Sequence, residues 1–140
     1  MAWSSIIGQT VLKSLLQRAV LQGRVSSAYC FWGPEGVGKD ALALEFAKLL
    51  NCQSPRRNTD TIEACDSCID CRQAARLEHP SIRFVFALPA PKARTEASPL
   101  LGLSDEQITL LREELRRKAE NPYYNISLPN ALQIHISTVR

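Results

Sequence analysis

The sequence predicts an α/β fold with a parallel sheet and a small inserted metal-binding module, and three observations support this. A short apolar segment at 28–32 leads through a glycine-rich loop into a helical stretch at 40–50. β-branched and aromatic residues at 82–88 are typical of a second buried strand. Four of the five cysteines fall between residues 52 and 71. Helices on both faces of a parallel sheet make a three-layer sandwich.

Length and composition bound the function classes. The 140 residues fit one domain, and the formal net charge of +3 is too small to indicate nucleic-acid binding by itself. No apolar run approaches the roughly 20 residues that a membrane helix needs, and the N-terminus lacks the pattern of a secretory signal. We therefore expect a cytoplasmic protein without membrane contact. In such a reducing compartment, cysteines serve metal binding or burial rather than disulfides.

Apolar periodicity and capping signals predict four helices. The first covers 4–22, with the helix proper starting after Gly8 and Gly23 as its C-terminal cap. Two others are expected at 40–50 and 65–77. The last starts at Ser104, which has capping-box spacing to Gln107, and ends at 121–122.

The remaining segments are predicted as strands and loops. Strands are expected at 28–32, 82–88 and 132–136, with Cys30 buried in the first as an apolar residue. Polar residues at 51–64 predict a loop. A loop rich in proline and small residues at 89–103, together with the helix after it, forms a predicted insertion over 89–122.

The segment GPEGVGKD at 33–40 meets seven of the eight positions of the phosphate-loop pattern G-x-x-x-x-G-K-[ST]. Gly33, Gly36 and Gly38 let successive backbone N–H groups face inward as an anion-binding nest, and the helix start adds partial positive charge. Lys39 is expected to bridge the outer phosphates. The alternative is a strand-to-helix turn that merely needs glycine.

Asp40 occupies the eighth position, where Ser or Thr would give its hydroxyl to magnesium. A carboxylate about 4 Å from a phosphate oxygen repels it by about 4 kcal/mol at an effective dielectric near 20, which is about a thousandfold in affinity. One alternative stays open, in which Asp40 ligates magnesium directly or through water. We expect weak or absent ATPase activity, and we assign no catalytic residue.

The tandem C-x-x-C-x-x-C at Cys65, Cys68 and Cys71, together with Cys52, has the spacing of a tetrahedral zinc site. An iron–sulfur cluster and unliganded thiols are the alternatives. Residues 52–76 form the predicted zinc module, and the segment 51–72 contains few large apolar groups that could offset the entropy of ordering. Four ligands leave no open position, so the zinc is expected to be structural.

Together these motifs resemble the N-terminal part of bacterial DNA polymerase III clamp-loader subunits, which are AAA+ proteins. The resemblance rests on Ile7-Gly8-Gln9, the phosphate loop, the triple-cysteine segment and His79-Pro80-Ser81. It implies an AAA+ phosphate-loop domain whose N-terminal part is residues 1–140, with the remainder beyond residue 140. It covers residues 5–88 well and is weaker from 126 to 140.

Within the family, Asp40 resembles the degenerate loop of the delta prime subunit rather than the Thr of gamma/tau. The resemblance implies a stator in a hetero-pentameric ring with gamma/tau and delta, which helps load the sliding clamp and meets primed DNA only indirectly. The chain would then be a component of the polymerase holoenzyme, a DNA-directed nucleotidyltransferase, without being an ATPase itself. The alternative is an active ATP-hydrolysing motor of the gamma/tau kind.

Overall fold

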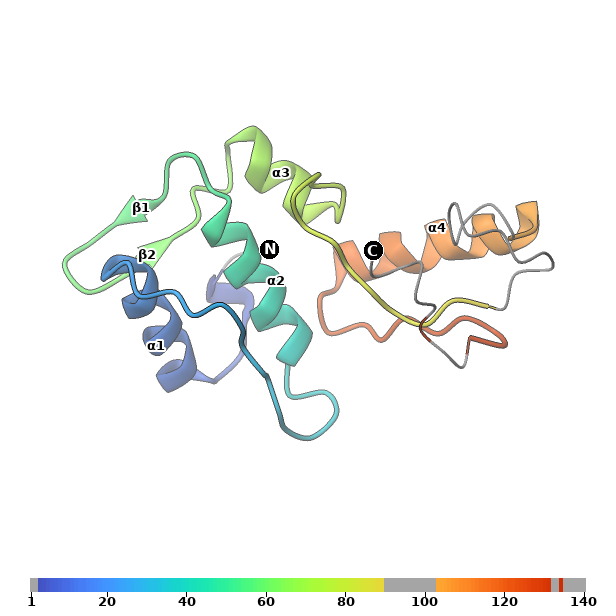
Figure 1. Cartoon of the computed structure of the whole chain (residues 1–140), viewed down its shortest axis with the longest axis horizontal. Coiled ribbons are helices and arrows are strands. Elements are labelled where there is room, and N and C mark those ends of the chain that lie inside the picture. Colours follow the sequence, from blue (N-terminus) through green and yellow to red (C-terminus); the bar gives the residue numbers. More distant parts are fainter. Residues whose placement is uncertain (1–2, 90–102, 132–133, 135–140) are drawn as a thin grey trace. The chain divides into compact units, whose positions relative to one another are not determined.

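The computed structural model describes residues 3–89, 103–131 and 134, and the chain divides into two compact units. Unit 1 comprises Met1–Ile82 and unit 2 comprises Arg83–Arg140. In chain order the elements are a 3-10 helix η1 (Trp3–Ser5), α1 (Thr10–Leu21), α2 (Lys39–Leu50), β1 (Arg56–Arg57), β2 (Ile62–Glu63), α3 (Ile69–Ala75) and α4 (Asp105–Glu120). Figure 1 labels the α-helices and the strands. Unit 2 contains α4, and unit 1 contains the rest.

Helix α1 begins and ends where glycine allows a left-handed backbone. Gly8 has a φ of 68° and Gly23 a φ of 65°. Beyond Gly23, the N–H of Arg24 donates to the carbonyl of Ala19 at 2.8 Å, which closes the helix with a Schellman-type cap. The predicted start after Gly8 and the predicted cap at Gly23 are therefore confirmed.

Helix α2 is the central element of unit 1, since it packs against both α1 and α3. The helix predicted at 40–50 is confirmed with one extra residue at its start. A hydrogen bond from Gln17 Nε2 to the carbonyl of Ile62, 3.0 Å long, joins α1 to β2. The buried apolar residues of this unit come from all these elements and are Trp3, Ile6, Leu16, Ala41, Leu42, Leu44, Phe46, Leu49, Ile62, Ala64, Cys71 and Ala74.

The structure differs from the prediction at 28–32. Within residues 3–89 and 103–131, the only strand pairing is the antiparallel pair β1–β2, so this part of the chain does not form the predicted parallel sheet. Tyr29 packs edge-on against Phe46 of α2, with ring centroids 5.1 Å apart. Cys30, predicted to be buried, is exposed, and Trp32 is 95% exposed. The segment thus contacts α2 through Tyr29 and forms no β-ladder with the other described residues.

Two predictions around the cysteines need correction. The polar segment 51–64, predicted as a loop, contains the β1–β2 hairpin, in which Arg56 pairs with Glu63. The helix predicted at 65–77 is shorter, because α3 starts only at Ile69. The chain before it is a turn in which Asp66 has a φ of 59°. A left-handed residue of this kind breaks the helical path.

Unit 2 is built on α4. Ser104 accepts a hydrogen bond from the N–H of Gln107, and the Gln107 side chain accepts one from the N–H of Ser104, so the predicted capping box is confirmed. The segment 82–88, predicted as a strand, is not a strand of the structure, and only Leu88 forms an isolated β-bridge. The Leu88 side chain belongs to a buried cluster with Leu111 of α4 and Leu128.

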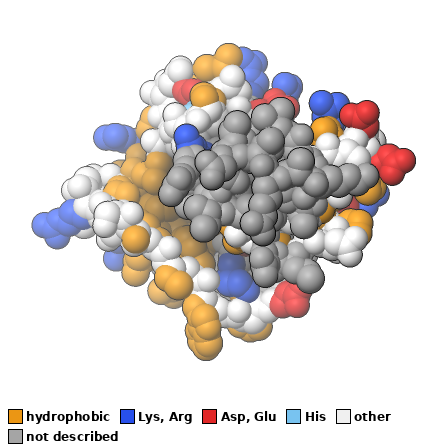
Figure 2. Space-filling model, turned by 45° about the vertical axis from the view of Figure 1, so that its right-hand side comes forward, with side chains coloured by type: hydrophobic (Ala, Val, Ile, Leu, Met, Phe, Trp, Pro, Cys, Tyr) orange, Lys and Arg blue, Asp and Glu red, His pale blue; other side chains and the backbone are white. Residues whose placement is uncertain are grey.

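The predicted loop at 89–103 and the predicted strand at 132–136 lie largely outside the described residues. In the part of the chain that is described, no helix is both long enough and apolar enough to cross a membrane. Large apolar side chains nevertheless reach the surface, as the orange areas in Figure 2 show. Among them, Ile7 is 82% exposed and Val11 is 76% exposed.

Candidate metal centre and phosphate loop

The four predicted metal ligands converge although they come from three parts of unit 1. Cys52 follows the end of α2, Cys65 and Cys68 lie on the turn before α3, and Cys71 lies within α3. Their Sγ atoms all lie within 4.8 Å of one another. The structure therefore brings together all four cysteines that the spacing singled out.

The sulfur geometry fits a tetrahedral metal such as zinc. With zinc–sulfur bonds of about 2.3 Å, a regular tetrahedron has sulfur–sulfur edges of about 3.8 Å. The Sγ atoms of Cys65 and Cys71 are 3.9 Å apart. Four thiolates without a carboxylate or water are the donor set of a closed structural site. These residues could hold zinc, and no position is left open for catalysis.

Backbone N–H groups point at three of the sulfurs. The N–H of Cys65 donates to Cys52 Sγ at 3.3 Å, that of Cys68 to Cys65 Sγ at 3.3 Å, and that of Cys71 to Cys68 Sγ at 3.4 Å. Such bonds favour the thiolate, which is the form that binds metal. Hydrogen bonding from Ser67 and the N–H of Cys68 lowers the pKa of Cys65 to about 5. Burial instead raises the pKa of Cys71.

Two acidic residues among the cysteines, Asp66 and Asp70, form hydrogen bonds with side chains outside the cysteine segment. Lys48 of α2 donates to Asp66 Oδ1 at 2.6 Å and to Glu45 Oε1 at 2.8 Å. Asp70 Oδ1 lies 3.2 Å from His79 Nε2, and His79 Nδ1 accepts the N–H of Ser81, so Nε2 carries the proton and donates to Asp70. The pair is nine residues apart in the sequence, and the chain that follows α3 returns His79 to Asp70 in the first turn of that helix.

The phosphate loop has the backbone that its glycines predicted. Gly36 and Gly38 have φ values of 77° and 89°, and Gly38 caps the start of α2. A side chain at such φ values would be strained, which explains the glycines. The Lys39 ammonium, however, donates to two carbonyls of its own loop, that of Gly33 at 2.9 Å and that of Pro34 at 2.7 Å. In this arrangement the lysine ammonium is hydrogen-bonded to backbone carbonyls of the loop itself.

Asp40 lies in the first turn of α2, on the exposed side. An acidic residue at this position interacts favourably with the positive end of the helix dipole. The same positive end is what a phosphate group would use. The Asp40 carboxylate therefore places a negative charge at the N-terminus of α2, where a bound phosphate would otherwise supply it.

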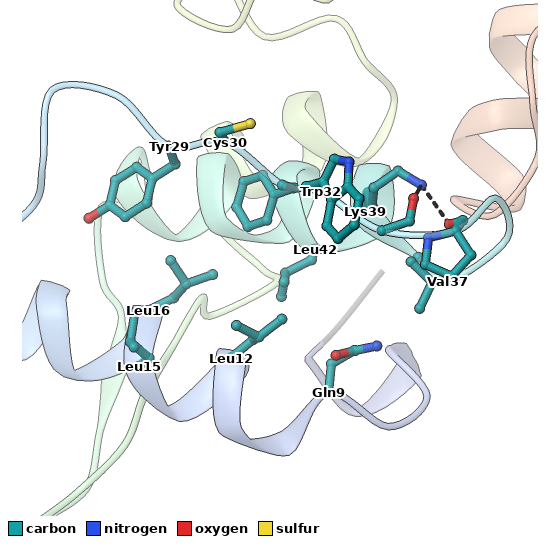
Figure 3. Close-up of a pocket in the computed structure, with 14 residues that line it drawn as sticks. Gln9, Leu12, Leu15, Leu16, Tyr29, Cys30, Trp32, Val37, Lys39 and Leu42 are labelled. Carbon is teal, nitrogen blue, oxygen red and sulfur yellow. Dashed lines mark hydrogen bonds between the residues drawn. The ribbon is translucent and has the colours of Figure 1, made fainter.

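A cavity of about 580 Å³ adjoins the loop, between α1 and the segment 29–34. Figure 3 shows Leu12, Leu15 and Leu16 of α1 rising towards Tyr29 and Trp32, with Lys39 at one end. The volume is in the range of small-molecule sites. The arrangement could hold an anionic group at the loop and an apolar ring beside it. Sequence analysis missed this cavity, because its apolar α1 residues have the periodicity of ordinary core residues.

Comparison with known proteins gives one family and several partial relatives. The family described as "DNA polymerase III, delta subunit" matches residues 8–130. DNA polymerase III subunit tau of Bacillus subtilis is 37% identical over 70 residues, which are 50% of this chain and 12% of that protein. DNA polymerase III subunit gamma/tau of Mycobacterium bovis is 36% identical over 69 residues, 49% of this chain and 12% of that protein.

Similarity extends to plant proteins as well. Protein STICHEL-like 2 of Arabidopsis thaliana is 34% identical over 67 residues, 48% of this chain and 8% of that protein. No solved structure matches the chain. The matched part thus spans only about a tenth of the length of these relatives, 12% at most in the three named here.

Proposed function

The chain belongs to the DNA polymerase III delta-subunit family of AAA+ phosphate-loop domains, and on this premise we propose that it is a clamp-loader subunit of the delta prime type. In this role it acts in DNA replication as a stator that helps load the sliding clamp while hydrolysing little or no ATP. Its partners are gamma/tau and delta subunits in a hetero-pentameric ring, the clamp, and primed DNA indirectly. Its place of action is the cytoplasm.

The observation that carries the proposal is the combination of Lys39 and Asp40. A phosphate loop that hydrolyses ATP needs its lysine on the phosphates and a hydroxyl on magnesium. Here the lysine bonds to the carbonyls of Gly33 and Pro34, and a carboxylate stands at the hydroxyl position. The lysine is thus satisfied within the empty loop, and the carboxylate at the hydroxyl position repels a bound phosphate. The domain then contributes its shape and its surfaces to the ring rather than hydrolysis.

The metal site is part of the same proposal. Cys52, Cys65, Cys68 and Cys71 hold a structural zinc that orders the module at 52–76. Zinc supplies four strong bonds where the segment has few apolar side chains to bury. Gly33, Gly36, Gly38, Lys39 and Asp40 form the degenerate phosphate loop. The segment 89–122 is an insertion, and the chain is the N-terminal part of a larger AAA+ domain.

A second candidate function is an ATP-hydrolysing motor of the gamma/tau kind. The similarity to proteins named tau and gamma/tau favours it, since they are 36–37% identical over about half of this chain. In that case Asp40 holds magnesium directly, because a carboxylate is a good ligand for this ion.

Reconstitution separates the two functions. The protein is assembled with its gamma/tau and delta subunits, and ATP hydrolysis is measured with the unchanged protein and with Lys39→Ala. The stator proposal expects the same assembly and the same hydrolysis rate in both. A hydrolysis rate that falls severalfold with Lys39→Ala, while assembly is unchanged, would favour the motor function instead.

A further inference from the structure

Asp66, the residue after Cys65, forms ion pairs with two basic residues that lie outside the segment 65–71. Lys48 Nζ lies 2.6 Å from its Oδ1, and Arg56 Nη2 lies 3.3 Å from its Oδ2. The Arg56 side chain is largely exposed, whereas only 2% of the Lys48 side chain is exposed. An ion pair with a buried partner is screened less by solvent than one at the surface. The contact with Lys48 is therefore the stronger constraint on Asp66.

The backbone of Asp66 shapes the turn that aims two of the sulfurs. Its φ of 59° lies in the left-handed region, which costs energy for residues other than glycine and is tolerated best by Asn and Asp. This turn lets the N–H of Cys68 reach Cys65 Sγ at 3.3 Å. A side-chain contact that holds Asp66 thus holds the spacing between Cys65 and Cys68.

Lys48 is itself fixed in place by α2. Its ammonium also bonds to Glu45 Oε1 at 2.8 Å, and that carboxylate has only 2% of its side chain exposed. The second oxygen, Oε2, is buried and has no hydrogen-bond partner among the residues that the structure describes. A buried carboxylate and ammonium are retained together, because removing either leaves the other uncompensated. The ammonium therefore has little freedom, and it presents a fixed anchor to Asp66.

We propose that Lys48 is a positioning residue for the metal centre: by holding Asp66 it fixes the Cys65–Cys68 turn in the geometry that binds metal. Metal affinity then depends on a charge in α2, the helix that also carries the phosphate loop at its other end. The inference rests on the proposed metal site, since it requires the four cysteines to bind a metal. It assigns a positioning function to Asp66, an acidic residue among the cysteines.

The experiment uses the 140-residue chain and Co²⁺ as a spectroscopic probe, followed by competition with Zn²⁺. Asp66→Asn removes the charge but keeps a residue that tolerates the left-handed backbone. Glu45→Gln combined with Lys48→Met removes the anchor without leaving a buried charge unpaired. Asp60→Asn is the matched control, because Asp60 is an exposed carboxylate of the same module. Circular dichroism of each variant verifies that it is folded.

Both test variants are expected to bind metal roughly 10- to 100-fold more weakly, the usual cost of losing a group that orients metal ligands. The Co²⁺ absorption bands of the folded variants should also shift, which a loss of global stability alone would not cause. The control should match the unchanged chain. Unchanged affinity and spectra in both variants would overturn the inference while leaving the metal site in place. A failure of the unchanged chain to take up Co²⁺ would overturn the metal site and the inference together.

Discussion

Replacing Asp40 by Thr should convert the phosphate loop into one that binds nucleotide with magnesium. The substitution removes a carboxylate from the first turn of α2 and supplies the hydroxyl that the motif lacks. It lies on the exposed side of the helix, so the fold should be kept, at the cost of the interaction between Asp40 and the helix dipole. Lys39 would then exchange its bonds to the loop carbonyls for bonds to phosphate oxygens.

The size of the effect follows from the exposure of Asp40. Two unit charges about 4 Å apart repel by about 1 kcal/mol in water and about 4 kcal/mol at an effective dielectric of 20. Asp40 is exposed, but a bound triphosphate would displace part of its water. The affinity for ATP with magnesium should therefore rise by a factor between about 5 and about 1,000.

Isothermal titration of ATP in the presence and absence of Mg²⁺ measures the change. Asp60→Thr serves as the control, since it makes the same chemical change in an exposed position outside the loop. The reasoning is refuted if Asp40→Thr binds no more tightly than the unchanged chain. It is also refuted if the unchanged chain binds tightly with Mg²⁺ and Asp40→Thr weakens that binding, because Asp40 would then be a metal ligand.

Three further predictions concern metal, capping and pH. Chelation of zinc, or Cys71→Ser, should unfold the module at 52–76. Mass spectrometry should show loss of bound zinc, and proteolysis within the module should become faster. Cys30→Ser is the control and should leave both readouts unchanged, because Cys30 is exposed and outside the cluster. Ser104→Ala should lower the free energy of unfolding by about 1 kcal/mol in urea titrations, and an unchanged midpoint would contradict the capping role. The N–H of Ser127 and other hydrogen bonds lower the pKa of Glu114 from its usual 4.5, so this carboxylate stabilises the fold above pH 4.5 and its contribution is lost as the pH falls through the lowered pKa. Glu114→Gln should make the free energy of unfolding less dependent on pH in this acid range. An unchanged pH dependence in the variant would contradict the contribution of Glu114.

Features set by neighbouring residues could be predicted from the sequence. The capping box at Ser104 and the glycine cap at Gly23 each depend on contacts within a few residues, and both are confirmed. The convergence of the four cysteines was also predictable, because short spacers between ligands are typical of metal sites. In the phosphate loop, the positive φ values follow from the glycines themselves.

Features set by distant partners could not be predicted in the same way. A β-strand is stable only when it pairs with a neighbouring strand. The composition of 28–32 and 82–88 favours an extended backbone, but it does not say whether a neighbouring strand is present. Phe86 and Leu88 instead pack in a cluster with residues of α4. The hairpin at 56–63 was missed because each strand has only two residues and no apolar alternation. The anchoring of Asp66 by Lys48 joins residues 18 apart, and no periodicity reports such a contact.

A structure of the chain determined after incubation with ATP and Mg²⁺ tests the proposal of an inactive phosphate loop most directly. The proposal predicts that Lys39 keeps its bonds to the carbonyls of Gly33 and Pro34 and that the loop holds no triphosphate. A triphosphate bound in the loop at full occupancy, with its Mg²⁺ ligated by the Asp40 carboxylate, would contradict it.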